Sequence, residues 1–287
     1  MIYSAHIGLS YTCNLKCRHC FVKKNKDNGF VLKNFDSIIE GLYSRGLSYI
    51  IYTYGEPFLV KNFISIVEKT SNKNIVQTIM TNGTQITEQV AKRISNIPNL
   101  RIMLSLDSYI ANEHDFRRSE KGTFNRVINA INLFNKYGQK FGVATTVNIA
   151  NQNRIYGLLR LAEKYHINYL SLLRMREGLI LGNIDKNSEY MDVAEKYYSD
   201  QSKFGGKKII FHDIELIPYL KERQVLNYNI VRENSCLSNE NIAIQPNGLY
   251  SKCNFSDPMG CLSLNTDYRE LDSKLSRRSV ICKYASF

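Results

Sequence analysis

The sequence contains no run of about 18 apolar residues, the length that a membrane-spanning helix needs. No N-terminal segment combines a basic start, an apolar centre and a cleavage site. We therefore expect a cytoplasmic protein without a membrane partner. Acidic residues are also few: the sequence has 26 Asp and Glu against 38 Lys and Arg, which gives a formal net charge of +12. An anionic partner would suit this balance, but the basic residues are dispersed, which favours a solvated basic surface.

The chain also lacks internal repeats, a Pro- or Ser-rich linker and zinc-finger spacing. Without clustered basic and aromatic residues, a nucleic-acid partner is disfavoured. At 287 residues, the length fits one large domain with a small appendage. The seven cysteines occur in a chain that is neither small nor visibly exported, so metal ligation explains them better than disulfides do.

Strand-like and helix-like segments alternate along the first part of the chain, which predicts an α/β fold with a parallel sheet. The expected strands are 5–10, 49–53, 76–80, 101–106, 142–149 and 169–173, and the expected helices are 35–44, 62–70, 88–95, 125–137 and 154–165. Six β/α units predict an incomplete version of the eight-unit barrel, with chemistry at the carboxyl ends of the strands.

The alternation weakens after residue 182, where 190–198 and 214–223 are expected helices and 208–211 an expected strand. The predicted division is therefore a partial (β/α)6 barrel at 1–181, a bridging segment at 182–230 and a small hairpin and helix module at 231–287.

Three cysteines fall within eight residues, Cys13, Cys17 and Cys20, directly after the first expected strand. This C-x3-C-x2-C spacing places three soft metal ligands on one loop. A cubane cluster has four irons and normally takes one thiolate per iron, so three thiolates leave one iron open to a small molecule. A zinc knuckle and buried inert thiols are the alternatives, but zinc sites are usually closed by four ligands. The spacing favours an iron–sulfur cluster.

The triplet, with the aromatic His19 directly before its last cysteine, resembles the signature of the radical SAM superfamily. In that family the open iron of a [4Fe–4S] cluster binds the amino and carboxylate groups of S-adenosylmethionine (SAM). One electron from the cluster cleaves SAM to a 5′-deoxyadenosyl radical, which abstracts hydrogen from the substrate. The resemblance also implies a partial (β/α)6 barrel whose open side admits the substrate.

Tyr-Gly-Glu-Pro at 54–57 follows the second expected strand and resembles the Gly-Gly-Glu-Pro motif that binds the amino group of SAM in this family. Tyr54 stands where the family has its first glycine. Gly55 would let the backbone approach the ligand, and the Glu56 carboxylate would accept from an ammonium. The tripeptide alone is also typical of a simple turn.

Two further segments lie at the ends of expected strands. Thr-Asn-Gly-Thr at 81–84 resembles the family's Thr-Asn-Gly element and implies Asn82 as a site residue, although a structural turn between strand and helix is the stronger expectation. Ser-Leu-Asp-Ser at 105–108 resembles the Ser-x-Asp-Gly segment of members with C-terminal cluster modules. It implies a hydroxyl contact from Ser105 to SAM. A guanidinium pairs two-pronged with a carboxylate, which makes Arg117 the preferred clamp for the SAM carboxylate and Arg118 the alternative.

The other four cysteines lie near the end of the sequence. Cys236 and Cys253, with Gly248 between them, resemble the hairpin start of SPASM and Twitch modules, in which thiolates bind auxiliary iron–sulfur clusters. Residues 242–250 independently indicate a strand, an Asn-Gly turn and a strand. With Cys261 and Cys282 the count reaches four, which one cluster needs. We expect one auxiliary cluster, favouring [4Fe–4S], in a shortened Twitch-like module; Cys261 is the least secure ligand, and a four-thiolate zinc site is the alternative.

The resemblance implies a radical SAM enzyme that acts on a ribosomally synthesised precursor peptide, by cross-linking, epimerisation or oxidation. Its expected partners are this peptide, a separate leader-recognition protein, and an electron donor such as flavodoxin or ferredoxin. One alternative is a radical SAM dehydrogenase or cyclase of a small metabolite, and another is a Cys-rich zinc-binding nucleic-acid module. The sequence predicts neither the bond formed, nor an acid, base or radical-quenching residue, nor the oligomeric state.

Overall fold

A computed structural model describes residues 2–22, 29–177, 180–213, 215–225 and 241–277. All six predicted strands form and lie parallel to one another. They are β1 (Ser4–Gly8), β2 (Tyr49–Thr53), β3 (Val76–Thr81), β4 (Leu100–Ser105), β5 (Phe141–Val147) and β6 (Tyr169–Arg174). The predicted α/β fold is therefore confirmed.

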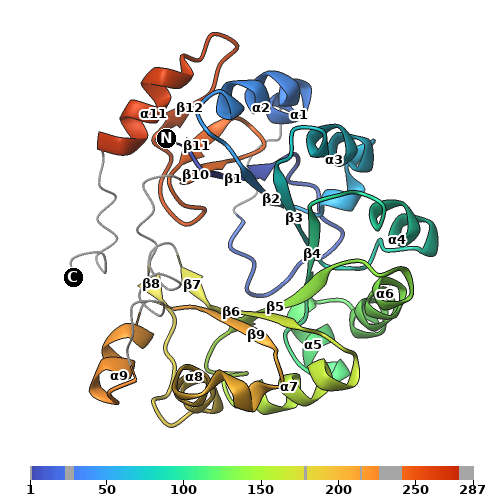
Figure 1. The fold of residues 1–287 in the computed structure, drawn as a ribbon, viewed down its shortest axis with the longest axis vertical. Coiled ribbons are helices and arrows are strands. Elements are labelled where there is room, and N and C mark those ends of the chain that lie inside the picture. The colour runs from blue at the N-terminus through green and yellow to red at the C-terminus, as the bar shows by residue number, and fades with distance from the viewer. Residues whose placement is uncertain (1, 23–28, 178–179, 214, 226–240, 278–287) are drawn as a thin grey trace.

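Two more parallel strands extend this set at its two edges. β9 (Lys208–His212) pairs with β6, and β10 (Asn241–Ile244) pairs with β1. β11 (Leu249–Ser251) and β12 (Gly260–Cys261) then continue the sheet in antiparallel fashion, giving the order β12-β11-β10-β1-β2-β3-β4-β5-β6-β9. The sheet curves into an arc (Figure 1). Among the described residues β9 and β10 do not pair, so this arc stays open on one side.

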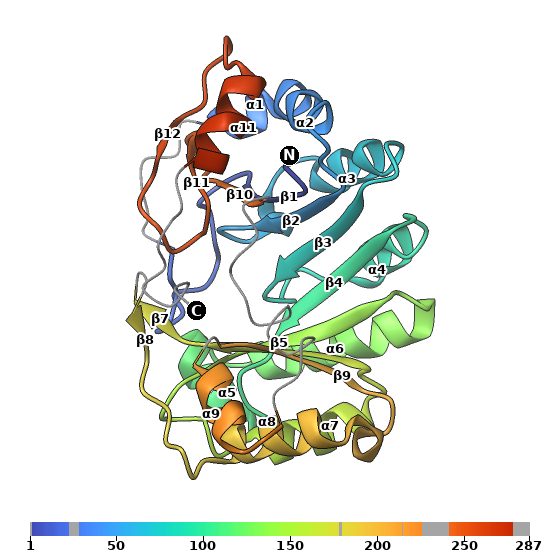
Figure 2. The same ribbon diagram turned by 60° about the vertical axis from the view of Figure 1, so that its left-hand side comes forward.

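Helices cover the outer face of the arc, as Figures 1 and 2 show. Those at predicted positions are α2 (Phe35–Tyr43), α3 (Phe63–Ser71), α4 (Glu88–Ile94), α6 (Thr123–Tyr137), α7 (Ile155–Lys164), α8 (Glu189–Ser199) and α9 (Leu216–Glu222). The helices α1 (Phe30–Lys33), α5 (Ala111–Arg118) and α11 (Tyr268–Arg277) were not predicted, nor were the 3-10 turns η1 (Pro57–Leu59) and η2 (Gln201–Phe204) and the small hairpin of β7 (Arg176–Glu177) and β8 (Ile180–Leu181).

The core lies between the helices and the outward side of the sheet. Along β2, Ile50 and Tyr52 are fully buried beneath the helices, whereas the alternate Thr53 faces inward and lines a cavity. On α6, Val127, Ile131 and Phe134 form a fully buried stripe. Burying such side chains stabilises the fold by roughly 1.5–3 kcal/mol each, which fixes the helices to the sheet.

The hydrogen-bonded sheet runs through all three predicted segments, because β9 lies in the bridging segment and β10 in the C-terminal module. The division at 181 and 230 stays a prediction. The predicted hairpin does form, as β10 and β11 pair around a turn in which the Gly248 amide donates to the Gln245 carbonyl at 2.8 Å. Throughout the described ranges, every helix is too short or too polar to cross a membrane.

Candidate functional site

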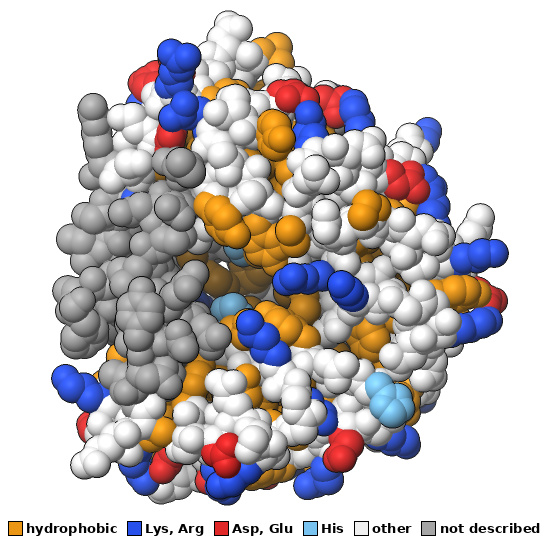
Figure 3. Space-filling view, viewed as in Figure 1, with side chains coloured by type: hydrophobic (Ala, Val, Ile, Leu, Met, Phe, Trp, Pro, Cys, Tyr) orange, Lys and Arg blue, Asp and Glu red, His pale blue; other side chains and the backbone are white. Residues whose placement is uncertain are grey.

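The carboxyl ends of the parallel strands surround a cavity of about 370 Å³, which opens in the central hollow of the molecule (Figure 3). Its lining includes eight of the residues predicted from the sequence: Cys13, Cys17, His19, Cys20, Gly55, Glu56, Asn82 and Ser105. These residues lie at or after the carboxyl ends of four consecutive strands, β1 to β4, which the parallel sheet gathers at one edge. Arg117 is the one predicted SAM contact that does not line this cavity.

The cysteine-bearing loop is fixed at several points. The Cys20 amide donates to the Cys17 carbonyl at 3.2 Å, and the Arg18 amide donates to the Arg117 carbonyl at 3.0 Å. Cys13 and Cys17 are half-buried, and Cys20 is exposed. Burial raises the pKa of the Cys13 and Cys17 thiols, so a metal would have to displace their protons. Three thiols from one ordered loop on one cavity wall fit the donor set of a cluster with an open iron.

The turn after β2 packs directly against this loop. The Glu56 amide donates to the Thr12 carbonyl at 2.8 Å. Gly55 has a φ of +51°, and a Cβ placed there would lie 2.4 Å from the Thr12 carbonyl oxygen. The glycine is thus required by the contact between turn and loop. Tyr54, at φ +60°, also adopts the left-handed region, which costs a non-glycine residue roughly 1–2 kcal/mol.

The Glu56 carboxylate is buried and positioned by three donors. Oε1 accepts from the Thr81 hydroxyl at 2.7 Å and the Phe58 amide at 3.2 Å, and Oε2 accepts from the Asn82 amide at 2.8 Å. Burial raises the pKa of Glu56 to about 6, and these hydrogen bonds oppose the rise. At pH 7 the group is therefore mostly ionised, and it can accept from a cation in the cavity.

Asn82 connects the loop after β3 to the cysteine loop. Its Nδ2 donates to Asn14 Oδ1 at 3.0 Å and lies 4.0 Å from Cys13 Sγ. Its Oδ1 accepts from the Thr84 amide at 2.9 Å, as in an Asx turn. Asn82 therefore has both a turn role and a contact with the cysteine loop.

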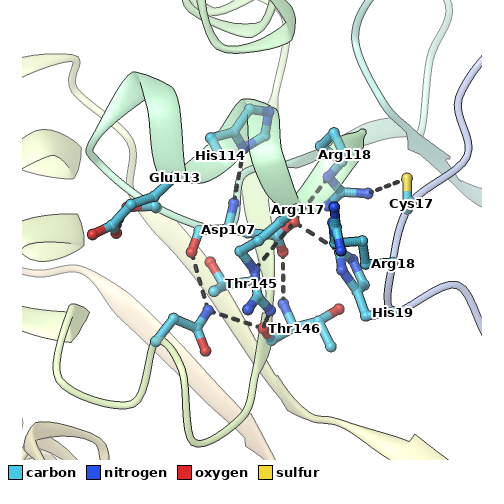
Figure 4. Close-up of polar contacts among 12 residues, drawn as sticks. Cys17, Arg18, His19, Asp107, Glu113, His114, Arg117, Arg118, Thr145 and Thr146 are labelled. Carbon is cyan, nitrogen blue, oxygen red and sulfur yellow. Dashed lines mark hydrogen bonds and ion pairs between the residues drawn. The ribbon is translucent and has the colours of Figure 1, made fainter. Parts of the chain in front are cut away.

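Two adjacent arginines at the end of α5 point in different directions (Figure 4). Arg117 donates to the Thr146 carbonyl at 2.7 Å and to Asn148 Oδ1 at 3.1 Å, away from the cavity lining. Arg118 lines the cavity and donates from Nη1 to Cys17 Sγ at 3.6 Å. The alternative clamp, Arg118, thus lies where a ligand beside the cysteines would be.

Asp107, to which sequence analysis assigned no role, lies between the side chains of Arg118 and His19 (Figure 4). Its side chain is fully buried, and its Oδ2 lies 2.9 Å from Arg118 Nε and 3.5 Å from His19 Nε2. Although burial opposes ionisation, Arg118 holds the pKa of Asp107 below its ordinary value. The Ser-x-Asp-Gly resemblance was the available signal for this residue.

His114 and Asp115 have structural contacts. The Asp107 amide donates to His114 Nδ1 at 3.2 Å. Asp115 accepts from the Gly122 amide at 2.6 Å and the Phe124 amide at 2.8 Å, which caps the start of α6. The Gly-Thr-Phe segment at 122–124 is thereby joined to α5.

Two of the four C-terminal cysteines are described. Cys253 is half-buried and accepts from the Phe255 amide at 3.5 Å, and Cys261 is exposed on β12. Cys236 and Cys282 lie outside the described residues, so the four-thiolate site stays a prediction. Within the described part of the chain, no three His, Cys, Asp or Glu side chains are grouped to hold a single metal ion, and this holds for Cys13, Cys17 and Cys20 too, which share only the cavity lining. Phe255 reaches the cavity lining and contacts Phe21, with ring centroids 5.0 Å apart.

Comparison with known proteins gives one family match. The model of the radical SAM superfamily matches residues 7–161, a range that holds the cysteine loop and the ends of β1 to β5. A Methanosarcina barkeri protein, Fe-coproporphyrin III synthase, is 28% identical over 173 residues, covering 56% of this chain and 43% of that protein. The subtilosin biosynthesis protein AlbA of Bacillus subtilis is 28% identical over 157 residues, covering 54% of this chain and 35% of that protein. The aligned part is less than half of either relative.

Solved structures share the fold. Streptococcus suis SuiB bound to its precursor peptide SuiA superposes with a TM-score of 0.71 at 19% identity, over 88% of this chain and 59% of that chain. The enzyme anSMEcpe with bound AdoMet gives a TM-score of 0.68 at 19% identity, over 97% of this chain and 84% of that chain. The arrangement of strands and helices therefore occurs in proteins of low sequence identity.

Proposed function

Because the chain belongs to the radical SAM superfamily, we propose that it cleaves SAM reductively at a [4Fe–4S] cluster held by Cys13, Cys17 and Cys20. The observation that carries this proposal is the common cavity. Three thiols of one loop share it with a buried carboxylate, an amide, a hydroxyl and a guanidinium from the ends of β2, β3, β4 and α5. With cluster and SAM bound, the chemistry supplied is one-electron cleavage of SAM to a radical that abstracts hydrogen from the substrate.

Each neighbouring side chain has a proposed role toward SAM. Glu56 is ionised and directed into the cavity, so it would accept from the amino group of SAM. Ser105 would donate to the carboxylate of SAM. Arg118 would clamp the same carboxylate in place of Arg117, since Arg118 lines the cavity and Arg117 does not. His19 and Asn82 would hold the cysteine loop in its place.

The proposed substrate is a precursor peptide, consistent with several similar proteins. SuiB has been solved with its precursor peptide SuiA. AlbA is named for biosynthesis of the bacteriocin subtilosin, SkfB for maturation of sporulation killing factor, and MftC as the mycofactocin maturase. The cavity opens in the central hollow of the molecule, which would admit an extended segment (Figure 3). A leader-recognition protein and a flavodoxin or ferredoxin are the proposed partners, and cross-linking, epimerisation or oxidation is the proposed outcome.

A small metabolite is the second candidate substrate, because Fe-coproporphyrin III synthase and an AdoMet-dependent heme synthase are also similar to this chain, at 28% and 25% identity. No observation supports the zinc-binding nucleic-acid module, and the assignment to the radical SAM superfamily argues against it. Co-expression with a short peptide encoded beside this protein, followed by mass analysis, separates the two enzymatic candidates. A mass change in the peptide supports the first, and an unchanged peptide with a modified porphyrin supports the second.

SAM cleavage is tested with anaerobically reconstituted protein. We expect dithionite-reduced protein to contain iron and sulfide and to release 5′-deoxyadenosine from SAM. Cys17→Ala should abolish the release, because one iron of the cluster loses its ligand. Release that persists in the variant, or wild-type protein without sulfide, would contradict the proposed function.

A further inference from the structure

The carboxylate of Asp107 is fully buried at the end of β4 and surrounded by nitrogen atoms of three side chains. Its Oδ2 lies 2.9 Å from Arg118 Nε, 3.5 Å from His19 Nε2 and 3.9 Å from Arg117 Nε. Its Oδ1 accepts from the Thr146 amide at 3.1 Å, which ties the group to β5. Figure 4 shows these contacts around the one carboxylate.

Arg118 is the group that balances this charge. His19 Nε2 lies 3.5 Å from the carboxylate, farther away than Arg118 Nε at 2.9 Å. Arg117 is farther away and bonded to Thr146 and Asn148. An unpaired buried carboxylate costs several kcal/mol, so the ion pair with Arg118 is what makes its burial tolerable.

The same guanidinium reaches the cysteine loop. Arg118 Nη1 donates to Cys17 Sγ at 3.6 Å, while its Nε lies 2.9 Å from Asp107 Oδ2 in an ion pair without a hydrogen bond. The guanidinium is planar and rigid, so fixing its Nε edge also fixes the direction of its other N–H groups. The Arg118 guanidinium therefore contacts the Asp107 carboxylate through one edge and the Cys17 sulfur through another.

We propose that Asp107 is a positioning residue that holds the Arg118 guanidinium against the Cys17 sulfur and so raises the reduction potential of the cluster. This inference rests on the proposed function, which assigns a cluster to that sulfur. Hydrogen bonds to the sulfurs and nearby charge set the potential of iron–sulfur clusters. A cation beside the sulfur stabilises the reduced cluster, which carries one more negative charge.

The test is a redox titration of the reconstituted full chain without SAM. The electron paramagnetic resonance signal of the reduced cluster reports the fraction reduced at each potential. Arg118→Met removes the N–H donor and the charge, so its potential should shift to a more negative value. Asp107→Asn separates two explanations by the sign of its shift. If Asp107 acts only by its own charge, losing that charge shifts the potential upward; if it positions Arg118, the potential moves downward, toward that of Arg118→Met.

A double-mutant cycle and a matched control complete the design. In the Arg118→Met background, Asp107→Asn should cause no further downward shift, and this double variant leaves no unpaired buried charge that would unfold the chain. Arg117→Met also removes one positive charge, but Arg117 does not donate to the Cys17 sulfur. Its shift in reduction potential should therefore be smaller than that of Arg118→Met.

An upward or absent shift in Asp107→Asn, or equal shifts in Arg117→Met and Arg118→Met, would overturn the inference while leaving the proposed function intact. A wild-type protein without a reducible cluster would overturn both. The potential is measured without SAM or substrate, so general damage to turnover does not imitate the expected result.

Discussion

Glu56 illustrates how a single residue serves both the fold and the site. Its carboxylate accepts from Thr81, Phe58 and Asn82, which joins the ends of β2 and β3, and it also lines the cavity. Its position in the sequence was predictable, because Gly-Glu-Pro follows a strand in a known motif. Its network was not, because the partners come from another β/α unit and depend on strand register.

The affinity for SAM should depend on the ionisation of Glu56. Burial raises the pKa of this group to about 6, and only its ionised form attracts an ammonium. As the pH falls through that value the carboxylate gains a proton, so SAM affinity should fall by up to about tenfold per pH unit. Equilibrium binding from pH 8 to pH 5.5 measures this. Glu56→Gln should bind more weakly and with a flat profile, and an equal slope in wild type and variant would assign the titration to another group.

Gly55 allows a second prediction, because its left-handed backbone and its contact with Thr12 are separate constraints. In Gly55→Ala the new Cβ would lie 2.4 Å from a backbone oxygen, so the turn must move away from the cysteine loop. We expect the free energy of unfolding to fall by more than about 1 kcal/mol and cluster content to drop.

Gly138→Ala is the matched control for this prediction. Gly138 has a φ of +67°, but nothing lies within 4 Å of its added Cβ. It carries the same backbone strain without the clash, so its cluster content should stay normal. Urea unfolding and iron analysis measure both effects, and equal iron loss in the two variants would show that the close contact is not responsible.

At the scale of elements, the helix that carries Arg117 and Arg118 escaped sequence analysis for a physical reason. The segment 111–118 has no aliphatic stripe, and the side chains that α5 buries are His114, Arg117 and Arg118. Hydrophobic periodicity finds helices such as α6, whose buried face is apolar. It cannot find a helix such as α5, whose buried face is polar and stabilised by ion pairs, and α5 lies at the site.

Asp115 should matter to this region through the start of α6. Its carboxylate accepts from Gly122, Phe124 and the Thr123 hydroxyl, so Asp115→Ala leaves donors at the helix terminus without a partner. The free energy of unfolding should fall by about 1–2 kcal/mol. Glu120→Ala is the control, because the exposed pair of Glu120 with Arg126 contributes little, under about 1 kcal/mol. Equal loss in the two variants in urea denaturation would argue against the capping role.

At the scale of the whole molecule, pairing between strands far apart in the sequence determines which segments lie beside the site. Local patterns predicted the hairpin near residue 245, but not that β10 pairs with β1, in the register Ser4 with Asn241. That pairing brings the segment after β11 beside the start of the chain, where Asn254 Nδ2 lies 2.8 Å from His6 Nδ1. Sequence patterns of period two or 3.6 carry no information on which distant strands become neighbours.

This pairing bears on the predicted auxiliary cluster, because Cys253 lies next to Asn254 and Phe255, and Phe255 lines the cavity. We expect Cys253→Ala to lower iron and sulfide content while reduced protein still releases 5′-deoxyadenosine, since the cysteine loop keeps its ligands. Modification of the true substrate should be lost. Cys253→Ser, which keeps the size of the side chain, separates loss of a ligand from loss of packing. Iron content and substrate turnover equal to wild type in both variants would mean that Cys253 only packs against the cavity wall.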